Sequence, residues 1–119
     1  MRRSKTGSEA EQLACNYLNS HGLRLVERNF RAPWGEIDLV MQHGEQIVFV
    51  EVRYRRDTRY GTGAETVDRK KQTKLVRTAL YFLQNRRGAG DIPARFDVIS
   101  ITGEGASDDI DWIRDAFQA

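Results

Sequence analysis

The sequence predicts a single α/β domain over residues 1–119, with a mixed β-sheet flanked by helices. Three observations predict it: an amphipathic helix opens the chain, three strand-like segments follow, and a second amphipathic helix precedes a further strand. A chain of 119 residues, 39% hydrophobic and 30% charged, fits one globular domain. The strand–helix–strand portion permits a right-handed crossover into a parallel neighbouring strand.

The first helix is predicted over residues 7–20. Two capping boxes are available at its start, one pairing Thr6 with Glu9 and the other pairing Ser8 with Glu11. Its apolar positions recur at i, i+3, i+4, i+7 and i+8, which defines one buried stripe. The stripe consists of Ala10, Leu13, Ala14, Tyr17 and Leu18.

Three strands are predicted next, over residues 24–31, 35–42 and 46–54. The second and third form a hairpin whose two-residue loop is Gly44-Glu45. Glycine at the first loop position is what a type II′ turn prefers, because that position needs a positive φ.

A second helix is predicted over residues 66–85, and a further strand over residues 95–101. The tail from Asp108 is ambiguous, because its apolar residues would pack equally well in a short strand or in a final helical turn. The expected buried stripe of the second helix is Leu75, Val76, Ala79, Leu80 and Leu83.

The net charge of +2 hides a strong asymmetry. The segment from Arg53 to Arg77 has nine basic and three acidic residues, whereas the segment from Asp91 onward has two basic and seven acidic residues. A basic stretch of this size suits a phosphate-binding surface. A solvated helix face and loop would explain the same charges.

Three further features of the sequence argue against a disulfide-bonded, secreted or membrane-spanning protein. A single cysteine, Cys15, excludes an intrachain disulfide and is compatible with a reducing cytoplasm, so we expect a cytoplasmic protein. The basic N-terminus is followed by no apolar run, so no secretory signal is expected. The longest strictly aliphatic or aromatic run, Ile47 to Val50, is far too short to cross a membrane.

Two acidic residues of the hairpin are predicted to lie side by side. With Gly44-Glu45 as the loop, Asp38 falls directly opposite Glu51, and opposed residues have Cβ atoms about 4.5–5.5 Å apart. Moving the loop to His43-Gly44 makes the two residues diagonal neighbours on the same face. A change of one residue in loop length would separate the faces, so the inference depends on the turn.

The surroundings of this acidic pair indicate a metal site. The third strand is apolar on both faces, as in a central strand that is covered on both sides. Two carboxylates in such a place repel each other and lose hydration, and Mg²⁺ or Mn²⁺ would compensate because these ions prefer oxygen ligands. Alternatively, this end of the hairpin is open to water, or Arg53 and Arg31 neutralise the acids.

Five segments together resemble a known family: residues 7–11, 35–40 (GEIDLV), 48–53 (VFVEVR), 68–72 and 95–98. Over nearly the whole chain they resemble the YraN family of uncharacterised bacterial proteins. That family is in turn similar to the PD-(D/E)XK nucleases, which include restriction endonucleases and Holliday-junction resolvases. The resemblance implies a restriction-endonuclease-like core in the order α-β-β-β-α-β, with a short C-terminal element.

The resemblance also implies a catalytic site. Glu11 matches the acid of the first helix, Asp38 the strand aspartate, and Glu51-Val52-Arg53 the Glu-x-Lys pattern. Mg²⁺ or Mn²⁺ would be held by Asp38 and Glu51, with Glu11 directly or through water. The implied activity is cleavage of phosphodiester bonds in DNA, including branched or partly single-stranded DNA.

Three of these positions have alternative explanations. Arg53 replaces the usual lysine and cannot accept a proton, so its role would be to orient water or to hold the phosphate. Glu11 would equally serve a capping box with Ser8. Gln72 would position the phosphate or the attacking water, or it is a packing amide with a satisfied hydrogen bond.

Two other functions remain open from the sequence. One is a non-catalytic module that binds DNA or RNA on a nuclease-like fold, and the other is a protein-interaction domain whose acidic C-terminal segment meets a basic partner. Because related resolvases act in pairs, a homodimer is a further expectation, although no residue identifies its surface. The residues expected to contact nucleic acid are Arg55, Arg56, Arg59, Lys70, Lys71 and Lys74.

Overall fold

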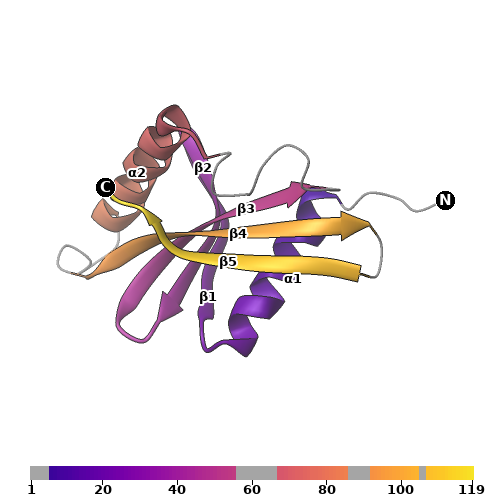
Figure 1. Ribbon diagram of the computed structural model, residues 1–119. Helices are drawn as coiled ribbons and strands as arrows, with labels where there is room; N and C mark the ends of the chain where they lie inside the picture. The colour runs from indigo at the N-terminus through magenta and orange to yellow at the C-terminus, as the bar shows by residue number, and fades with distance from the viewer. Residues whose placement is uncertain (1–5, 56–66, 86–91, 105–106) are drawn as a thin grey trace.

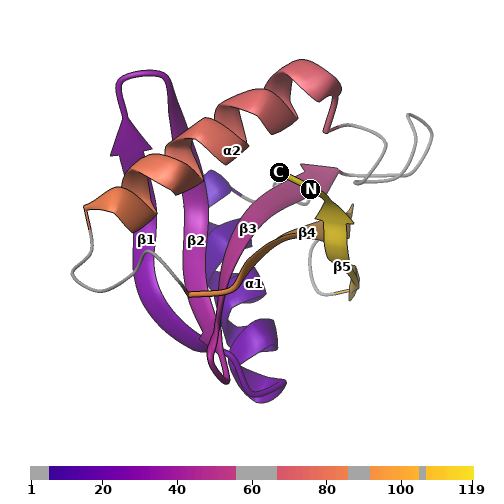
Figure 2. The same ribbon diagram turned by 90° about the vertical axis from the view of Figure 1, so that its left-hand side faces the viewer.

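The computed structural model describes residues 6–55, 67–85, 92–104 and 107–119. Over these residues the chain forms a five-stranded sheet with one helix on each face (Figure 1, Figure 2). The elements are α1 (Gly7–Ser20), β1 (Arg24–Ala32), β2 (Gly35–His43), β3 (Gln46–Arg55), α2 (Arg69–Gln84), β4 (Ala94–Glu104) and β5 (Ser107–Phe117).

The sheet is mixed, and its strands lie in the order β1-β2-β3-β4-β5. The β3 and β4 strands are parallel and are connected through α2, whereas the other neighbouring pairs are antiparallel. The predicted α/β class, the mixed sheet and the parallel neighbour after the second helix are therefore confirmed. No helix in the described portions is both long and apolar enough to cross a membrane.

The hydrophobic core has two layers, one on each face of the sheet. Each layer lies under one of the two helices, which Figure 2 shows on opposite faces. Alternate residues of β3 supply both: Val48 and Val50 pack with α1, whereas Ile47 and Phe49 pack with α2. This double burial explains why β3 is apolar on both faces. It also places Glu51, which follows Phe49 by two residues, on the face of the sheet that α2 covers.

The N-terminus of α1 is capped by Thr6 and not by Ser8. The Thr6 hydroxyl accepts a hydrogen bond from the Glu9 N–H at 3.1 Å, and a Glu9 carboxylate oxygen accepts one from the Thr6 N–H at 3.2 Å. The alternative box of Ser8 with Glu11 is not used, so capping does not explain Glu11. Buried Cys15 is a small packing residue of the same helix.

The β2–β3 hairpin has the predicted register. His43 pairs with Gln46, and the ladder continues to Leu39 opposite Val50. Gly44 has a φ of +62°, and its partner in the loop keeps a negative φ, as a type II′ turn requires. The turn therefore directs the two acidic residues to the same face, as expected.

The α2 helix begins later than predicted, at Arg69, because Asp68 caps it by accepting a hydrogen bond from the Lys71 N–H at 2.8 Å. The expected burial of Leu80 is wrong: its side chain is 52% exposed. Five residues after Leu75 the helix has turned about 140° away from the core. The buried face instead consists of Leu75, Thr78, Ala79 and Phe82.

The ambiguous tail is a strand. The β5 strand pairs antiparallel with β4 along one edge of the sheet, with Ile101 opposite Ile110. On one face, Ile110 and Trp112 pack against the core layer of α1, whereas Ile113 packs against the layer of α2. The alternation of apolar residues between the two layers is the physical reason for a strand in place of a helical turn.

Candidate functional site

Asp38 and Glu51 converge at the end of the β2–β3 ladder. Regular pairing stops at Leu39 and Val50, and beyond it the Asp38 carboxylate accepts a hydrogen bond from the Val52 N–H at 2.8 Å. The side chains of Asp38 and Glu51 are close enough to share a hydrogen bond. The two acids therefore form one site, as the hairpin register predicts.

The environment of Asp38 strongly favours its neutral form. Burial, followed by the negative charge of Glu51, raises the pKa of Asp38 from 3.8 to about 8. The hydrogen bond from Val52 opposes this rise, whereas the hydrogen bond with Glu51 and the charge of Glu11 add to it. At neutral pH, Asp38 is therefore mainly protonated. A cation bound between Asp38 and Glu51 would relieve the repulsion of the two carboxylates in place of that proton.

Two basic side chains compensate the charge of Glu51, which is only 5% exposed. The Lys71 ammonium lies 3.3 Å from a Glu51 carboxylate oxygen, and the Arg53 Nε lies 3.5 Å from the same oxygen. Arg53 is thus one neutralising partner, as one of the alternatives from the sequence proposed. Arg31 is not, because its guanidinium pairs instead with Glu36 at 3.5 Å.

Lys71 is a site residue that sequence reasoning assigned only to nucleic-acid contact. It lies 20 positions after Glu51, in the first turn of α2, and the crossover returns that turn to the end of β3. The glutamate–lysine pair of the Glu-x-Lys pattern therefore forms in space, between Glu51 of β3 and Lys71 of α2, rather than along one strand. The only signal for it in the sequence is the lysine–glutamine pair that opens the helix.

Glu11 reaches the same region from the opposite helix. Its charge contributes to the raised pKa of Asp38, and its carboxylate lies 3.8 Å from an Arg28 guanidinium nitrogen on β1. The helical acid is therefore directed toward the sheet, as the resemblance implies, although its nearest charged partner is a cation. Its exact contribution as a ligand stays a prediction.

Asn29 is a second residue that the sequence reasoning missed. It lies between the pairs Arg28–Leu39 and Phe30–Ile37, and therefore opposite Asp38. Its φ of +52° lies in the left-handed region, which asparagine tolerates better than most residues. With its amide nitrogen directed at the acids, Asn29 donates to Glu36 at 2.9 Å and to Glu11 at 3.1 Å. No local sequence signal identifies this bridge.

The arrangement offers two adjacent carboxylates, Asp38 and Glu51, to a metal ion. Within the described ranges, no three His, Cys, Asp or Glu side chains lie close enough together to enclose an ion. Asp38 and Glu51 alone supply adjacent hard oxygen donors. Such a pair suits Mg²⁺, which keeps several waters and takes further oxygens from substrate phosphates.

The other predicted residues are spread around this pair. The amide nitrogen of Gln72 donates to the Val67 carbonyl at 2.9 Å, as expected for a satisfied packing amide. Arg55 is half-buried at the end of β3, and Lys70 and Lys74 are exposed on α2. The predicted nucleic-acid contacts Arg56 and Arg59 lie outside the described residues.

A model of the uncharacterised protein family UPF0102 matches residues 10–101. The chain belongs to this family. A UPF0102 protein of Nitrosococcus oceani is 49% identical over 112 residues, which cover 94% of this chain and 90% of that protein. A UPF0102 protein of Stutzerimonas stutzeri is 49% identical over 114 residues, with 96% and 95% covered.

UPF0102 is the family that the YraN-like motifs indicated, so the family prediction is confirmed. A more distant UPF0102 protein, from Methylococcus capsulatus, is 44% identical over 117 residues, with 98% of this chain and 94% of that protein covered. The names of these UPF0102 relatives state no activity. The matched range runs from within α1 to within β4, and it includes Glu11, Asp38, Glu51 and Lys71.

Proposed function

We propose that this chain is a divalent-metal-dependent endonuclease of the PD-(D/E)XK type that hydrolyses phosphodiester bonds in DNA. The observation that supports it is the buried pair of Asp38 and Glu51, in which Asp38 has a pKa of about 8 and Glu51 contacts Lys71. Perturbed acids beside a specific cation are typical of functional sites. The α-β-β-β-α-β order and the mixed sheet are compatible with a restriction-endonuclease-like core.

The residues of the site have complementary roles in this proposal. Asp38 and Glu51 would hold Mg²⁺ or Mn²⁺, which lowers the pKa of a bound water and offsets the charge on the phosphate. Asp38 would have to release its proton in order to bind the ion. Arg53, which stays charged, holds the attacked phosphate or orients the attacking water. Lys71 can also move a proton, because an ammonium group deprotonates far more easily than a guanidinium group.

The activity is tested by incubating labelled duplex, flap and four-way DNA with Mg²⁺ or Mn²⁺, and in parallel with a chelator. We expect cleavage only with metal, and a rate at least about 10³-fold lower for Asp38→Asn, because the electrostatic stabilisation by the metal is lost. Glu45→Gln, an exposed acid in the hairpin turn, is the matched control and should cleave at the wild-type rate. Equal rates for wild type and Asp38→Asn would identify a contaminating nuclease.

Lys71 is expected to contribute to cleavage more than its exposed neighbour on α2. Lys71→Met should lower the single-turnover rate by about 10²-fold, which is typical for loss of a positioned proton donor or acceptor. Lys70→Met should lower it only modestly, because it removes a positive charge that does not contact Glu51. Equal rates for the two variants would remove Lys71 from the mechanism.

A non-catalytic nucleic-acid-binding module is the second candidate. It is favoured by the two ion pairs that already compensate Glu51, since Lys71 and Arg53 compete with a metal for the same carboxylate oxygen. Under this alternative, binding would be salt-sensitive, would need no metal and would survive Glu51→Gln. Cleavage that requires Asp38 decides against it.

A further inference from the structure

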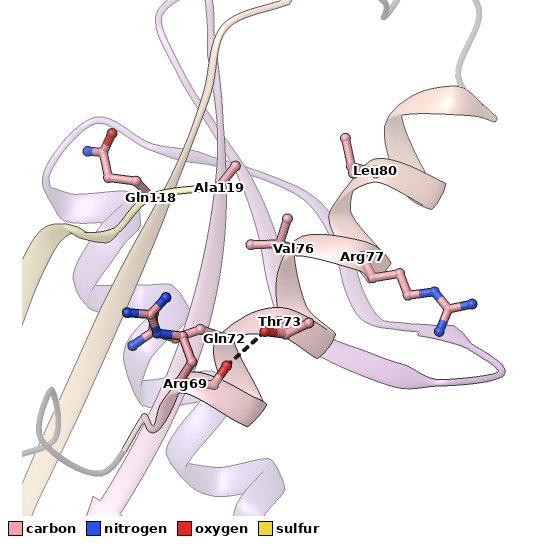
Figure 3. A pocket seen from close by; sticks show the side chains of 8 residues that line it. All are labelled: Arg69, Gln72, Thr73, Val76, Arg77, Leu80, Gln118 and Ala119. Atoms are coloured by element: carbon pink, nitrogen blue, oxygen red, sulfur yellow. Dashed lines mark hydrogen bonds between the residues drawn. The ribbon is translucent and has the colours of Figure 1, made fainter.

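The α2 helix has an apolar strip, Val76 and Leu80, at the edge of its buried face. Val76 is half-buried against the core, whereas Leu80 is exposed. Val76 and Leu80 lie one turn apart on the wall of a pocket of about 430 Å³, formed between α2 and the chain segment at Gln118 and Ala119 (Figure 3). Leu80 is 52% exposed, the largest exposed fraction among the large hydrophobic side chains of the described residues. An apolar pocket of this volume is in the range of small-ligand and nucleotide sites.

The same pocket wall is positively charged. Arg69 lies about two turns before Val76 on α2 and extends toward Gln118, whereas Arg77 extends away from Gln118 (Figure 3). The Arg77 guanidinium lies 4.2 Å from the ring centre of Trp34, so a cation–π contact holds it at one side of the pocket. In all, α2 contains five Lys or Arg residues and no Asp or Glu.

An apolar strip could bind either a second copy of the chain or a ligand, and the positive charge around the strip distinguishes between these two partners. A second copy of the chain in a two-fold interface would bring Arg69 and Arg77 of both copies together around the pocket, which opposes association. A nucleic-acid strand has complementary charge, and its bases are apolar on their faces. Only an unpaired base can reach a pocket of this kind, because a paired base is stacked within the duplex.

The pocket also adjoins the candidate cleavage site. Gln72 lies on the pocket wall, and the preceding residue, Lys71, contacts Glu51. One turn of α2 therefore has the acidic pair on one side and the pocket on the other.

We propose that this pocket holds an unpaired nucleotide of the substrate, with its base against Val76 and Leu80 and its phosphate at Arg69. The proposal rests on the proposed function for the class of substrate, nucleic acid. It extends that function by assigning a preference for single-stranded or branched strands to a defined surface. Arg77, held by Trp34, closes the pocket on the side of the β1–β2 hairpin.

The test is binding of a labelled single-stranded oligonucleotide and of a blunt duplex of equal length, measured by fluorescence anisotropy in chelator over a range of salt. Leu80→Ala is expected to weaken single-strand binding on the order of tenfold, as for loss of a contact to one base, with little effect on the duplex. The salt dependence should stay unchanged, because no charge is removed. Leu80 is exposed, so this substitution opens no cavity in the core.

Lys74→Gln is the matched comparison, because Lys74 is exposed on α2 but is not on the pocket wall. It should weaken binding of both nucleic acids alike and reduce the salt slope by about one. Wild-type affinity of Leu80→Ala for the single strand would overturn the proposal. So would a change in oligomeric state of Leu80→Ala in analytical ultracentrifugation, which would assign the strip to a second copy.

Cleavage assays separate this inference from the proposed function. If the wild type cleaves DNA but Leu80→Ala binds and cleaves single strands normally, the pocket assignment fails and the nuclease stands. If no metal supports cleavage while Leu80→Ala still loses single-strand binding selectively, the nuclease proposal fails and the pocket assignment stands.

Discussion

Replacing Asp38 with asparagine is expected to stabilise the folded chain, by an amount that grows with pH. The folded pKa of about 8 lies above the unfolded value of 3.8, so between these values the folded chain holds a proton that the unfolded chain releases. Wild-type stability therefore falls as pH rises from about 4 to about 8, and then levels off. Asparagine resembles the protonated side chain, can still accept the Val52 hydrogen bond, and has no such loss.

The expected gain for Asp38→Asn increases by up to about 1.4 kcal/mol per pH unit in this window. Between pH 6 and pH 8 the gap in the free energy of unfolding should widen by as much as about 3 kcal/mol, measured by urea denaturation in chelator. Glu45→Gln removes an exposed carboxylate and should show no such widening. Wild-type and Asp38→Asn curves that run parallel with pH would contradict the raised pKa.

The same substitution links stability to the proposed metal site. Mn²⁺ binds only to the deprotonated ligands, so it should stabilise the wild type more at pH 8 than at pH 6. The Asp38→Asn chain, with its ligand lost, should gain little at either pH. We therefore expect Asp38→Asn to be more stable than the wild type and yet inactive. The repulsion between the Asp38 and Glu51 carboxylates destabilises the fold, but the same two carboxylates are needed to bind the metal.

Replacing Asp97 with asparagine is expected to cause the largest loss of stability. Asp97 is fully buried, and its side chain lies on the other face of the sheet from that of Glu51. Its carboxylate accepts hydrogen bonds from Arg95 at 3.0 Å, from the Trp112 indole at 2.9 Å and from the Asp115 N–H at 3.0 Å. Asparagine would leave the largely buried Arg95 guanidinium without a counter-charge. Breaking such a pair from one side costs about 3–5 kcal/mol.

Urea denaturation of Asp97→Asn, compared with the double variant Asp97→Asn, Arg95→Met, tests this account. The double variant should recover part of the loss, because it removes the uncompensated charge along with its partner. Below its unfolding transition, Asp97→Asn should retain the DNA cleavage of the wild type, since the Asp97 side chain lies on the other face of the sheet from the acidic pair. A destabilisation of less than about 1 kcal/mol would show that the network contributes little.

Local chemistry explains the parts of the site that the sequence predicted. Gly44 supplies the positive φ of a two-residue turn, and that turn sets the register by which Asp38 and Glu51 share a face. The i, i+3, i+4 pattern likewise predicted α1 to its exact bounds. These features depend on residues close in sequence, whose geometry follows from backbone hydrogen bonding and side-chain period.

A long-range contact and a buried polar residue explain two of the parts that were missed. Asn29 bridges acids from α1 and β2, a contact that no local pattern encodes. Leu80 continues the apolar sequence of α2, but Thr78 takes the buried position, because its hydroxyl is satisfied by the Lys74 carbonyl at 2.7 Å. The spacing of apolar residues does not show that a threonine can be buried when its hydroxyl donates to a carbonyl of its own helix.

By itself, the sequence determined the order of helices and strands up to β4, the family, and the pairing of the two strand acids, since turn geometry and side-chain period act over a few residues. The tertiary structure alone decided that Lys71 meets Glu51, that Glu11 is directed to the sheet instead of capping its helix, and that α2 leaves Leu80 at a basic pocket. Those contacts depend on how each helix packs across the sheet, which is set by burial of the whole core and not by neighbours along the chain.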